Sequence, residues 1–446
     1  MRTGLFWFTN DLRLHDNPAL VRACMSVDRL VCLFNFEYSW SQHAQRMQQC
    51  PGKHRQRFIE QSVADLADNL AALGQVLVIR HGSHLDALTE CLERFQPTDV
   101  FQSVQHGFYE NEVWHRQQKA HSSCRFHRVS GYTLFDSASL PFTIENMPDG
   151  FGAFRRALEV QRPVAPLQSL TYLPPPPRAA LDDANVGASQ SPEQKSEQKP
   201  ESESSPMLGG ETAALQHLAT FFNSEFPARY KQTRNALDGW TNSCKFSPWL
   251  STGCLSVRKV ISALNTYEKE RVANDSTYWI YFELLWREYF QWYALRHGAR
   301  LFRFTGVSGR RPLTSFYPAR LMKWRSGKTP YPIVNACMNE LAATGYLSNR
   351  GRQIVASCLI HELGLDWRYG AAYFEQQLID YDVATNWGNW QYLAGVGAAT
   401  VTHRHFNLEK QVRQFDPDGR YVRQWGGETG ASAQLDHVDG SDWPLA

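Results

Sequence analysis

The first 140 residues alternate short apolar runs with amphipathic stretches, and this alternation constrains the fold more than any other feature. Four apolar runs predict strands buried on both faces, at 4–8, 29–36, 75–82 and 99–104. Between them, residues 58–73 and 86–95 repeat apolar side chains at helical spacing. We therefore expect an α/β doubly wound domain over 1–140. No G-x-G-x-x-G pattern follows the first run, so a dinucleotide site of the usual kind is not expected there.

The composition changes after this domain. Four prolines at 174–177 lead into a polar, proline-broken stretch at 188–206 that has few side chains to bury. We therefore predict an interdomain linker at 141–210, partly disordered. Residues 211–425 follow a helical pattern without a convincing strand and predict an all-α domain. The remainder, 426–446, is expected to be an acidic flexible tail.

Charge and aromatic residues are unevenly distributed. Of the 14 tryptophans, 11 lie beyond residue 211. Residues 211–425 carry 26 Lys and Arg against 17 Asp and Glu, a net charge of +9 that leaves −7 for the rest of the chain. A basic, aromatic-rich segment favours binding of a polyanion, although a solvated basic surface explains the charge equally well.

The nine cysteines form no C-x-x-C pair and no metal-ligand spacing, so no metal site is expected. An odd, scattered set is typical of buried thiols in a reducing compartment. The sequence contains no signal peptide and no apolar run of membrane-spanning length. These features predict a cytoplasmic protein.

A loop at 242–256 leads into two predicted helix starts. Ser247 is expected to cap the first helix, with Pro248 as its first residue, and Ser256 to cap the second. Backbone N–H groups, hydroxyls and Lys245 would together form a phosphate cradle. Two capped helices with nothing bound are the alternative interpretation.

A long helix is predicted over 276–298, with Ser276 as its cap. Glu283 and Trp286 share one face of it with other aromatic residues. A carboxylate inside an aromatic stripe must find a hydrogen-bond donor. The donor is either the polar edge of a ligand or Arg287, one turn further on, in an ordinary ion pair.

Within residues 348–370, a helix is predicted to start with Asn349, Arg350 and Arg352, although a helix N-terminus disfavours cations. The core-facing side chains of this helix are Val355, Leu359 and Leu363. An anionic ligand or a nearby acid would offset this cost, and Asp380 and Asp382 are candidates. A purely structural Arg–Asp pair explains the pattern as well.

A short helix is predicted to present Asn386 and Trp390, which lie four residues apart, on the same side. A packed aromatic hairpin between helices is the alternative.

Several of these stretches resemble the photolyase/cryptochrome family and, within it, the cryptochrome DASH branch. The resemblance extends over both predicted domains, apart from the linker and the tail. It rests on seven segments, among them WFTNDLRLHDNPAL and KFSPWLSTGCLS, at 7–20, 228–239, 245–256, 274–290, 327–357, 363–397 and 415–425.

The resemblance implies a blue-light-driven, FAD-dependent deoxyribodipyrimidine photo-lyase. In this chemistry, reduced flavin passes an electron to a flipped cyclobutane pyrimidine dimer, and the dimer splits. Two alternatives remain: a non-enzymatic blue-light photoreceptor with a DNA-binding or signalling role, and a nucleic-acid-binding regulator with a vestigial flavin. The short tail and the retained Glu283, Trp286 and Asn349 favour repair.

The resemblance also assigns site residues. Asn386 would face the redox-active nitrogen of the flavin, as donor or acceptor, and Asp382 would line the same pocket. Arg352 and Asp380 would pair beside the isoalloxazine ring. The phosphates and ribityl chain of FAD would be held by Tyr230, Ser243, Lys245, Phe246 and Ser247.

Other residues are assigned to DNA and to electron transfer. Glu283 would hydrogen-bond the damaged bases and Trp286 would stack on them. Arg234, Asn349 and Gln353 would complete the DNA contacts. Trp390 and Trp367 would be the inner two steps of a tryptophan chain that reduces the flavin.

Three positions depart from the usual family pattern. Thr9 replaces an arginine of the α/β domain, and Thr314 stands where the outermost chain tryptophan is usual, so Tyr317, Trp324 or Tyr392 are candidates for that step. Gln353 replaces the methionine common in duplex-acting photolyases and is typical of the DASH branch. It favours single-stranded DNA, because a weaker pocket does not offset the cost of extracting a dimer from a duplex.

The branch also carries a methenyltetrahydrofolate antenna, and Asn111 and Glu112 match the residues that usually hold its pterin. RNA is left open as a further partner, no membrane association is expected, and a monomer is favoured.

Overall fold

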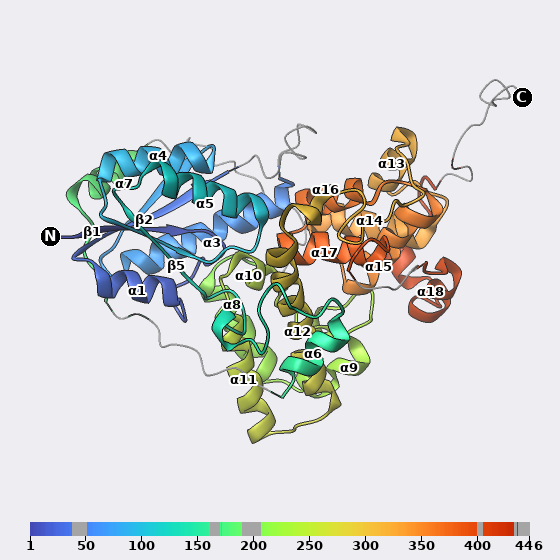
Figure 1. The fold of residues 1–446 in the computed structure, drawn as a ribbon. Coiled ribbons are helices and arrows are strands. Elements are labelled where there is room, and N and C mark those ends of the chain that lie inside the picture. Colours follow the sequence, from blue (N-terminus) through green and yellow to red (C-terminus); the bar gives the residue numbers. More distant parts are fainter. Residues whose placement is uncertain are drawn as a thin grey trace, which may run out of the picture. The chain divides into compact units, whose positions relative to one another are not determined.

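The computed structural model describes residues 1–37, 51–160, 170, 172–189, 207–398, 405–431 and 435, and Figure 1 shows its elements in chain order. The chain forms two compact units. Unit 1 comprises Met1–Lys231, Cys244–Gly298 and Ile379–Thr385, and unit 2 comprises Gln232–Ser243, Ala299–Leu378 and Asn386–Ala446. These units divide the chain differently from the predicted domains, whose boundaries stay a prediction.

Five parallel strands form the sheet of unit 1, in the order β3-β2-β1-β4-β5. They are β1 (Thr3–Phe8), β2 (Arg29–Phe36), β3 (Leu77–His81), β4 (Asp99–Ser103) and β5 (Arg125–Val129). The four predicted strands are confirmed. The prediction missed β5 because its residues alternate between basic and apolar types at a partly exposed sheet edge, and so form no apolar run.

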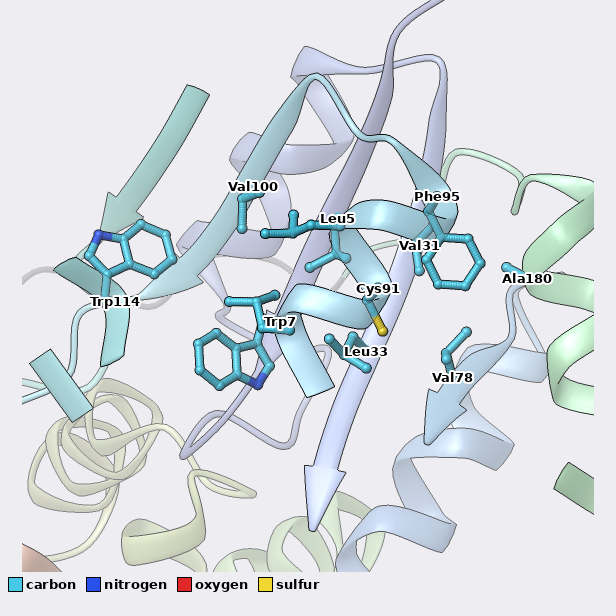
Figure 2. Packing of buried hydrophobic residues seen from close by; sticks show 12 residues of the cluster. Leu5, Trp7, Val31, Leu33, Val78, Cys91, Phe95, Val100, Trp114 and Ala180 are labelled. Carbon is cyan, nitrogen blue, oxygen red and sulfur yellow. The ribbon is translucent and has the colours of Figure 1, made fainter. Parts of the chain in front are cut away.

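Helices cover both faces of this sheet, which confirms the doubly wound α/β fold (Figure 1). One face is covered by α1 (Pro18–Ser26) and α3 (Lys53–Ala71), and the other by α4 (His84–Phe95), α5 (Phe108–Ala120) and α7 (Arg178–Ser189). Figure 2 shows the core on the second face. It consists of Leu5, Trp7, Val31, Leu33, Val78, Leu88, Cys91, Leu92, Phe95, Val100, Trp114 and Ala180.

The predicted linker, 141–210, contains regular structure. It includes α6 (Phe151–Leu158) and α7, and Phe154 and Leu158 are completely buried. Residues 190–206, most of the proline-broken stretch, lie outside the described residues.

Five more helices, α8 (Glu211–Phe222), α9 (Phe226–Thr233), α10 (Ser247–Thr252), α11 (Val257–Glu270) and α12 (Asp275–His297), follow. Buried polar contacts join α8 and α11 to the loop after β1. The Glu211 carboxylate accepts from the backbone N–H groups of Leu14, at 2.7 Å, and His15, at 2.9 Å. Arg258 pairs with the buried Asp16 at 2.9 Å. These contacts explain why helices of the predicted all-α domain belong to the same compact unit as the sheet.

Unit 2 is helical, with an isolated bridge between Ser315 and Leu365 and no strand in its described part. It contains α13 (Pro318–Arg325), α14 (Pro332–Thr344), α15 (Asn349–Ser357), α16 (Trp367–Gln377), most of α17 (Val383–Leu393), α18 (Leu408–Phe415) and α19 (Arg420–Gln424), with short η2 (Trp240–Asn242) and η3 (Gly298–Phe302). The helix start predicted at Asn349–Arg352 is confirmed as that of α15, and Val355, Leu359 and Leu363 are buried as predicted. A π-helical turn, η4 (Cys358–Glu362), follows α15, and Gly364, at φ +64°, ends it before α16.

Part of the predicted flexible tail is described. The Gly427 carbonyl accepts from Asn335 Nδ2 at 3.1 Å, and the Gly427 N–H donates to Val422. The start of the tail is therefore hydrogen-bonded to unit 2. Beyond residue 431, only residue 435 belongs to the described part of the chain.

None of the helices in the described ranges is long and apolar enough to cross a membrane. Within the same ranges, no group of three or more His, Cys, Asp or Glu is placed to hold a metal ion. Every cysteine that the structure describes is a free thiol.

Candidate functional site

The longest helix, α12, carries Glu283 and Trp286 in unit 1, and both side chains are half-buried. Its predicted cap was wrong by two residues. Asn274 is the N-cap and forms a capping box with Thr277, whereas Ser276 lies inside the helix and its hydroxyl accepts from the N–H of Lys231. Asp275 is the first residue of the helix, so the residue before it, Asn274, is the N-cap instead of Ser276.

Trp286 is fixed by an aromatic partner from α6. Its indole stacks on the ring of Phe151 with centroids 3.6 Å apart and an interplanar angle of 12°. Phe290, one turn along α12, packs at 5.7 Å. Phe151 occupies one face of the indole, so a base that stacks on Trp286 must use the other face.

Glu283 lies near two residues of the loop and helix before α10. The pKa of the Cys244 thiol is raised, first by burial and in part by the negative charge of Glu283, while a hydrogen bond with Tyr230 opposes this shift. Arg287 directs its guanidinium to Tyr132, donating to the carbonyl oxygen at 2.8 Å with the ring centroid 4.2 Å away. Cys244 is therefore influenced by both Glu283 and Tyr230.

Helix α10 begins one residue earlier than predicted, so the prediction of Ser247 as its cap is wrong, while the phosphate cradle stays a prediction. Phe246 is the N-cap of α10 and makes no side-chain cap, so Ser247 is the first helical residue and is exposed. Lys245 is buried and has φ +53°, a left-handed conformation that is unusual for a residue with a side chain. Ser256 caps α11 as predicted, accepting from the Arg258 N–H at 3.2 Å. The left-handed backbone of Lys245 is strained, and such strain is typical of functional loops.

Phe246 is almost completely buried and packs against His217 with centroids 5.5 Å apart. The half-buried Ser243 belongs to unit 2, whereas Lys245, Phe246 and Ser247 belong to unit 1. The shared role predicted for these residues stays a prediction.

Asp382, just before α17, is a buried carboxylate with several hydrogen-bond donors around it. It accepts from Tyr132 Oη at 2.6 Å, Gln291 Nε2 at 2.9 Å and the Thr385 N–H at 2.8 Å. Burial raises the pKa of Asp382, but the charge of Arg287 and these hydrogen bonds outweigh it and hold the pKa below its ordinary value. Asp382 is therefore a buried carboxylate fixed by its own unit.

Asp380 is likewise buried in unit 1, whereas Arg352 belongs to unit 2. The predicted pairing of these two residues stays a prediction. Within unit 2, Arg352 Nε donates to the Leu347 carbonyl at 2.8 Å, and the guanidinium lies 5.6 Å from the Tyr346 ring centroid.

The N-terminus of α15 presents the other predicted DNA residues. Ser348 caps the helix by accepting from the Gly351 N–H at 3.1 Å, and Asn349 is exposed. Gln353 is half-buried, and its Oε1 atom is buried without a hydrogen-bond partner among the described residues. Such an atom is costly unless a ligand or water satisfies it. This observation points to a polar ligand at the start of α15.

Arg350 and Arg234 lie close enough in unit 2 to repel each other. The pKa of Arg350 is lowered, first by burial and then by the charge of Arg234. Arg350 donates to Asn235 Oδ1 at 3.2 Å and lies 4.5 Å from the Phe415 ring centroid. Two crowded cations favour an anionic ligand nearby.

Helix α17 holds the predicted redox residues of unit 2. Asn386 donates from Nδ2 to the Ala371 carbonyl at 3.0 Å, which fixes the plane of its amide. Trp390, one turn later, is buried against Gly370, where an added Cβ would lie 2.2 Å from its Cη2 atom. The shared side predicted for Asn386 and Trp390 agrees with their spacing on this helix.

Trp367, the first residue of α16, is completely buried and donates from Nε1 to the Phe304 carbonyl at 3.0 Å. Its indole contacts Trp387 edge to face, with centroids 5.8 Å apart. From the resemblance, Trp387 was expected to be a packing or auxiliary redox residue, with no partner named. Its contact with Trp367 depends on the packing of α16 against α17, which no local pattern shows.

The predicted antenna residues lie on α5. Asn111 uses both ends of its amide within the protein, accepting from Arg128 Nη1 at 2.5 Å and donating to the Gly107 carbonyl at 2.6 Å. Glu112 is half-buried. Beside them, Glu110 Oε2, His106 Nδ1 and Arg128 Nε are buried without partners in the described part of the chain. The sequence missed these three, because each is an unremarkable polar residue in an amphipathic helix, loop or strand.

The position that departs from the family pattern in the first motif is also explained. Thr9 accepts a hydrogen bond at its hydroxyl from Gln105 Nε2, at 2.6 Å, and its N–H donates to Asp11 at 2.9 Å. A small hydroxyl therefore satisfies the local polar groups of the loop after β1.

Comparison with known proteins identifies the chain. A family model described as DNA photolyase matches residues 4–176, and one described as the FAD binding domain of DNA photolyase matches residues 279–434. A cryptochrome DASH of Idiomarina loihiensis is 49% identical over 444 residues, which cover 100% of this chain and 97% of that protein. The chain belongs to the photolyase/cryptochrome family, in its cryptochrome DASH branch.

Other members of the family agree in sequence and fold. The cryptochrome DASH of Vibrio parahaemolyticus is 47% identical over 450 residues, which cover 100% of this chain and 97% of that protein. The crystal structure of a Synechocystis sp. PCC6803 cryptochrome matches with a TM-score of 0.85 at 35% identity, covering 95% of this chain and 88% of that chain. The crystal structure of a bacterial class III photolyase from Agrobacterium tumefaciens matches with a TM-score of 0.75 at 25% identity. The match covers 95% of this chain and 86% of that chain.

These matches confirm the predicted family and the two-part fold, an α/β domain and a helical FAD-binding domain. The residues present fit a flavin nucleotide. Asn386 donates only one amide N–H, to Ala371, and so has polar groups to offer to the ring, and the buried Lys245 has a cationic side chain suited to a phosphate.

Proposed function

We propose that this cryptochrome DASH is a photo-lyase that uses blue light and FAD to split cyclobutane pyrimidine dimers, preferentially in single-stranded DNA. One observation carries the proposal. Glu283 and Trp286 lie one turn apart on α12, a carboxylate and a large aromatic surface, both half-buried. A carboxylate hydrogen-bonds the edge of a pyrimidine and an indole stacks on its face, which are the contacts that a flipped base needs.

In this proposal, the flavin supplies electron transfer when bound, and the protein supplies binding and orientation. Tyr230, Lys245 and the loop from Ser243 to Ser247 hold the phosphates and ribityl chain. Arg352 and Asp380 flank the ring system, and Asp382 supports its pocket from a fixed position. Asn386 offers either its N–H or its oxygen to the redox-active nitrogen, because Ala371 uses only one of its polar groups.

DNA contacts come from Arg234, Asn349 and Gln353, together with the lesion-binding pair on α12. The unpartnered Oε1 atom of Gln353 supports a polar rather than a methyl-rich pocket edge. We propose that this edge binds an already unpaired dimer well and competes poorly with base stacking in a duplex. We propose that the protein is a cytoplasmic monomer, and competition by an RNA oligomer would test RNA as a second ligand.

We further propose a methenyltetrahydrofolate antenna on α5, near Asn111 and Glu112. The buried, unpartnered Oε2 atom of Glu110 supports a polar ligand there. Burial also raises the pKa of Glu110, so a ligand that donates a hydrogen bond or carries positive charge would stabilise the carboxylate.

The test is repair of a dimer-containing thymidine oligomer under blue light, as single strand and as duplex, with reduced protein. We expect repair of the single strand alone. A matched Gln353→Met variant should gain duplex repair if the side chain sets the preference. Equal repair of both substrates by the native protein would contradict the single-strand preference but keep the lyase.

If FAD is bound and reducible but neither substrate is repaired, the photoreceptor alternative replaces the lyase. Loss of light-driven flavin reduction would instead favour the regulator with a vestigial flavin.

A further inference from the structure

Four tryptophans of unit 2, Trp324, Trp367, Trp387 and Trp390, are at most 2% exposed. Edge-to-face ring contacts join them in pairs. The centroids of Trp367 and Trp387 are 5.8 Å apart, and those of Trp324 and Trp390 are 6.4 Å apart. Indoles at such distances exchange electrons readily, so an oxidised Trp367 has Trp387 as a direct electron donor.

The indole N–H groups differ in their hydrogen-bond partners. Trp324 donates to the Val355 carbonyl and Trp367 to the Phe304 carbonyl, each at 3.0 Å. Trp387 donates instead to Oε2 of Glu375, also at 3.0 Å, and this glutamate is buried. A peptide carbonyl accepts a hydrogen bond but does not take up the proton, whereas a carboxylate does both. Among these three, Trp387 alone has a partner that can become protonated.

We propose that Trp387 is a proton-coupled electron carrier attached to the Trp390–Trp367 chain, with Glu375 as its proton acceptor. This inference rests on the proposed function in two steps: light-driven flavin reduction withdraws an electron from Trp390, and Trp367 refills Trp390 as the family resemblance implies. Trp387, which is in ring contact with Trp367, then refills Trp367. Oxidation makes the Trp387 N–H strongly acidic, and the proton moves from Nε1 to the Glu375 carboxylate. The products are a neutral Trp387 radical and a carboxylic acid.

The return step balances in the same way. One electron from an external thiolate, transferred through the protein because Trp387 is buried, reduces the Trp387 radical, and Glu375 returns the proton to Nε1. The thiolate becomes a thiyl radical, and two such thiyl radicals combine to form a disulfide. Until then, recombination with the flavin requires the electron and the proton to move back together, which slows it.

A carrier at Trp387 would compensate for the missing outermost tryptophan, which is Thr314 in this chain. A threonine is not oxidised under these conditions, and Thr314 occupies the position of the usual outermost tryptophan. The oxidising equivalent at Trp367 is therefore held by an internal carrier on α17 instead of passing to that position. Phe302, at 4.9 Å, covers another edge of Trp387 and keeps it away from solvent.

Flash photolysis of the FAD-loaded protein tests the proposal through the absorption of tryptophan radicals, which distinguishes the neutral radical from the radical cation. The native protein should form the neutral radical, with a formation rate that falls in D2O. Glu375→Gln keeps an acceptor oxygen for the indole but does not take up a proton, so the neutral-radical signal should be lost and the cation should recombine rapidly. Trp387→Phe should lose the same signal.

Glu340→Gln is the matched control, because Glu340 is a buried glutamate of unit 2 that bonds Tyr421, and it should behave like the native protein. Bound FAD and the Tm of each variant verify folding. A neutral radical that persists at native yield in Glu375→Gln or Trp387→Phe would overturn the inference while leaving the proposed function intact. Absence of any tryptophan radical in the native protein would instead defeat the photoreduction step itself, and the inference with it.

Discussion

Tyr132 donates its hydroxyl to Asp382 across 250 residues of sequence, with 2.6 Å between the oxygens. Tyr132 follows β5 of the sheet, and Asp382 directly precedes α17. The contact fixes a buried carboxylate inside unit 1, and Gln291 and the Thr385 N–H satisfy the same group. A hydrogen bond to a buried charge is stronger than one between neutral groups, so this pair is a sensitive point of the fold.

Tyr132→Phe should destabilise the protein by about 1.5–3 kcal/mol at neutral pH, the usual worth of a hydrogen bond to a charged group. The folded-state pKa of Asp382 lies below its ordinary value of 3.8. The stabilisation is therefore present above that value and is lost as the pH falls through the folded-state pKa. Urea unfolding at neutral and acid pH measures the effect. Tyr289→Phe is the control, since Tyr289 donates to a neutral backbone carbonyl, and its cost should not follow the titration of Asp382. A pH-independent cost of Tyr132→Phe would contradict the role of the pair.

Phe151→Leu should weaken binding of a dimer-containing single strand by about two- to tenfold, because an aromatic pair contributes roughly 0.5–1.5 kcal/mol beyond its buried area. The substitution removes the ring on which Trp286 stacks. Phe154→Leu, on the same helix, removes a ring that contacts Tyr289 and not Trp286, and should leave affinity unchanged. Fluorescence anisotropy with a labelled oligomer measures both, and equal losses would show a general effect on α6.

Asn386→Asp should change the flavin absorption spectrum recorded during photoreduction. In the native protein, Asn386 Nδ2 donates to the Ala371 carbonyl oxygen at 3.0 Å. In the variant, a carboxylate oxygen would replace this donor and face the Ala371 oxygen, which is also an acceptor. The aspartate must then take up a proton or turn away, and either change alters what it offers to the flavin. Asn389→Asp, exposed on the same helix, should give the native spectrum. An unchanged spectrum in Asn386→Asp would remove the role assigned to this residue.

Trp390→Phe should slow photoreduction without abolishing FAD binding. Trp390 is buried against Gly370 and edge to face with Phe374, so a smaller aromatic ring fits without a clash. Phenylalanine is much harder to oxidise than tryptophan, which interrupts the chain. Trp240→Phe, at a site where the indole is 38% exposed, is the control. Photoreduction at the native rate in Trp390→Phe would exclude Trp390 as an electron carrier.

Much of the architecture follows from local pattern alone. The apolar runs of β1 to β4 predicted a buried parallel sheet because both faces of such strands are covered. Ser256 was correctly predicted as a cap because a serine before a helical stripe satisfies a free N–H. The family motifs supplied the candidate site residues, whose roles stay predictions.

Local pattern failed where neighbours compete or where the partner is distant. Ser276 and Asn274 are both good caps, and the winner depends on which residue begins the α12 backbone. The strand β5 lies at a sheet edge, where packing covers too little to demand an apolar run.

The tertiary structure alone decided the partners of the site residues. Phe151 stacks on Trp286, Tyr132 donates a hydrogen bond to Asp382, and Trp387 donates one to Glu375. No periodicity in the sequence predicts any of these pairs. Composition and spacing indicate which face of an element is buried, because the hydrophobic effect is non-directional and depends on the apolar area that a face can remove from water. Which polar group satisfies a buried carboxylate or indole depends on the three-dimensional packing of elements far apart in sequence, and that packing sets the chemistry of the site.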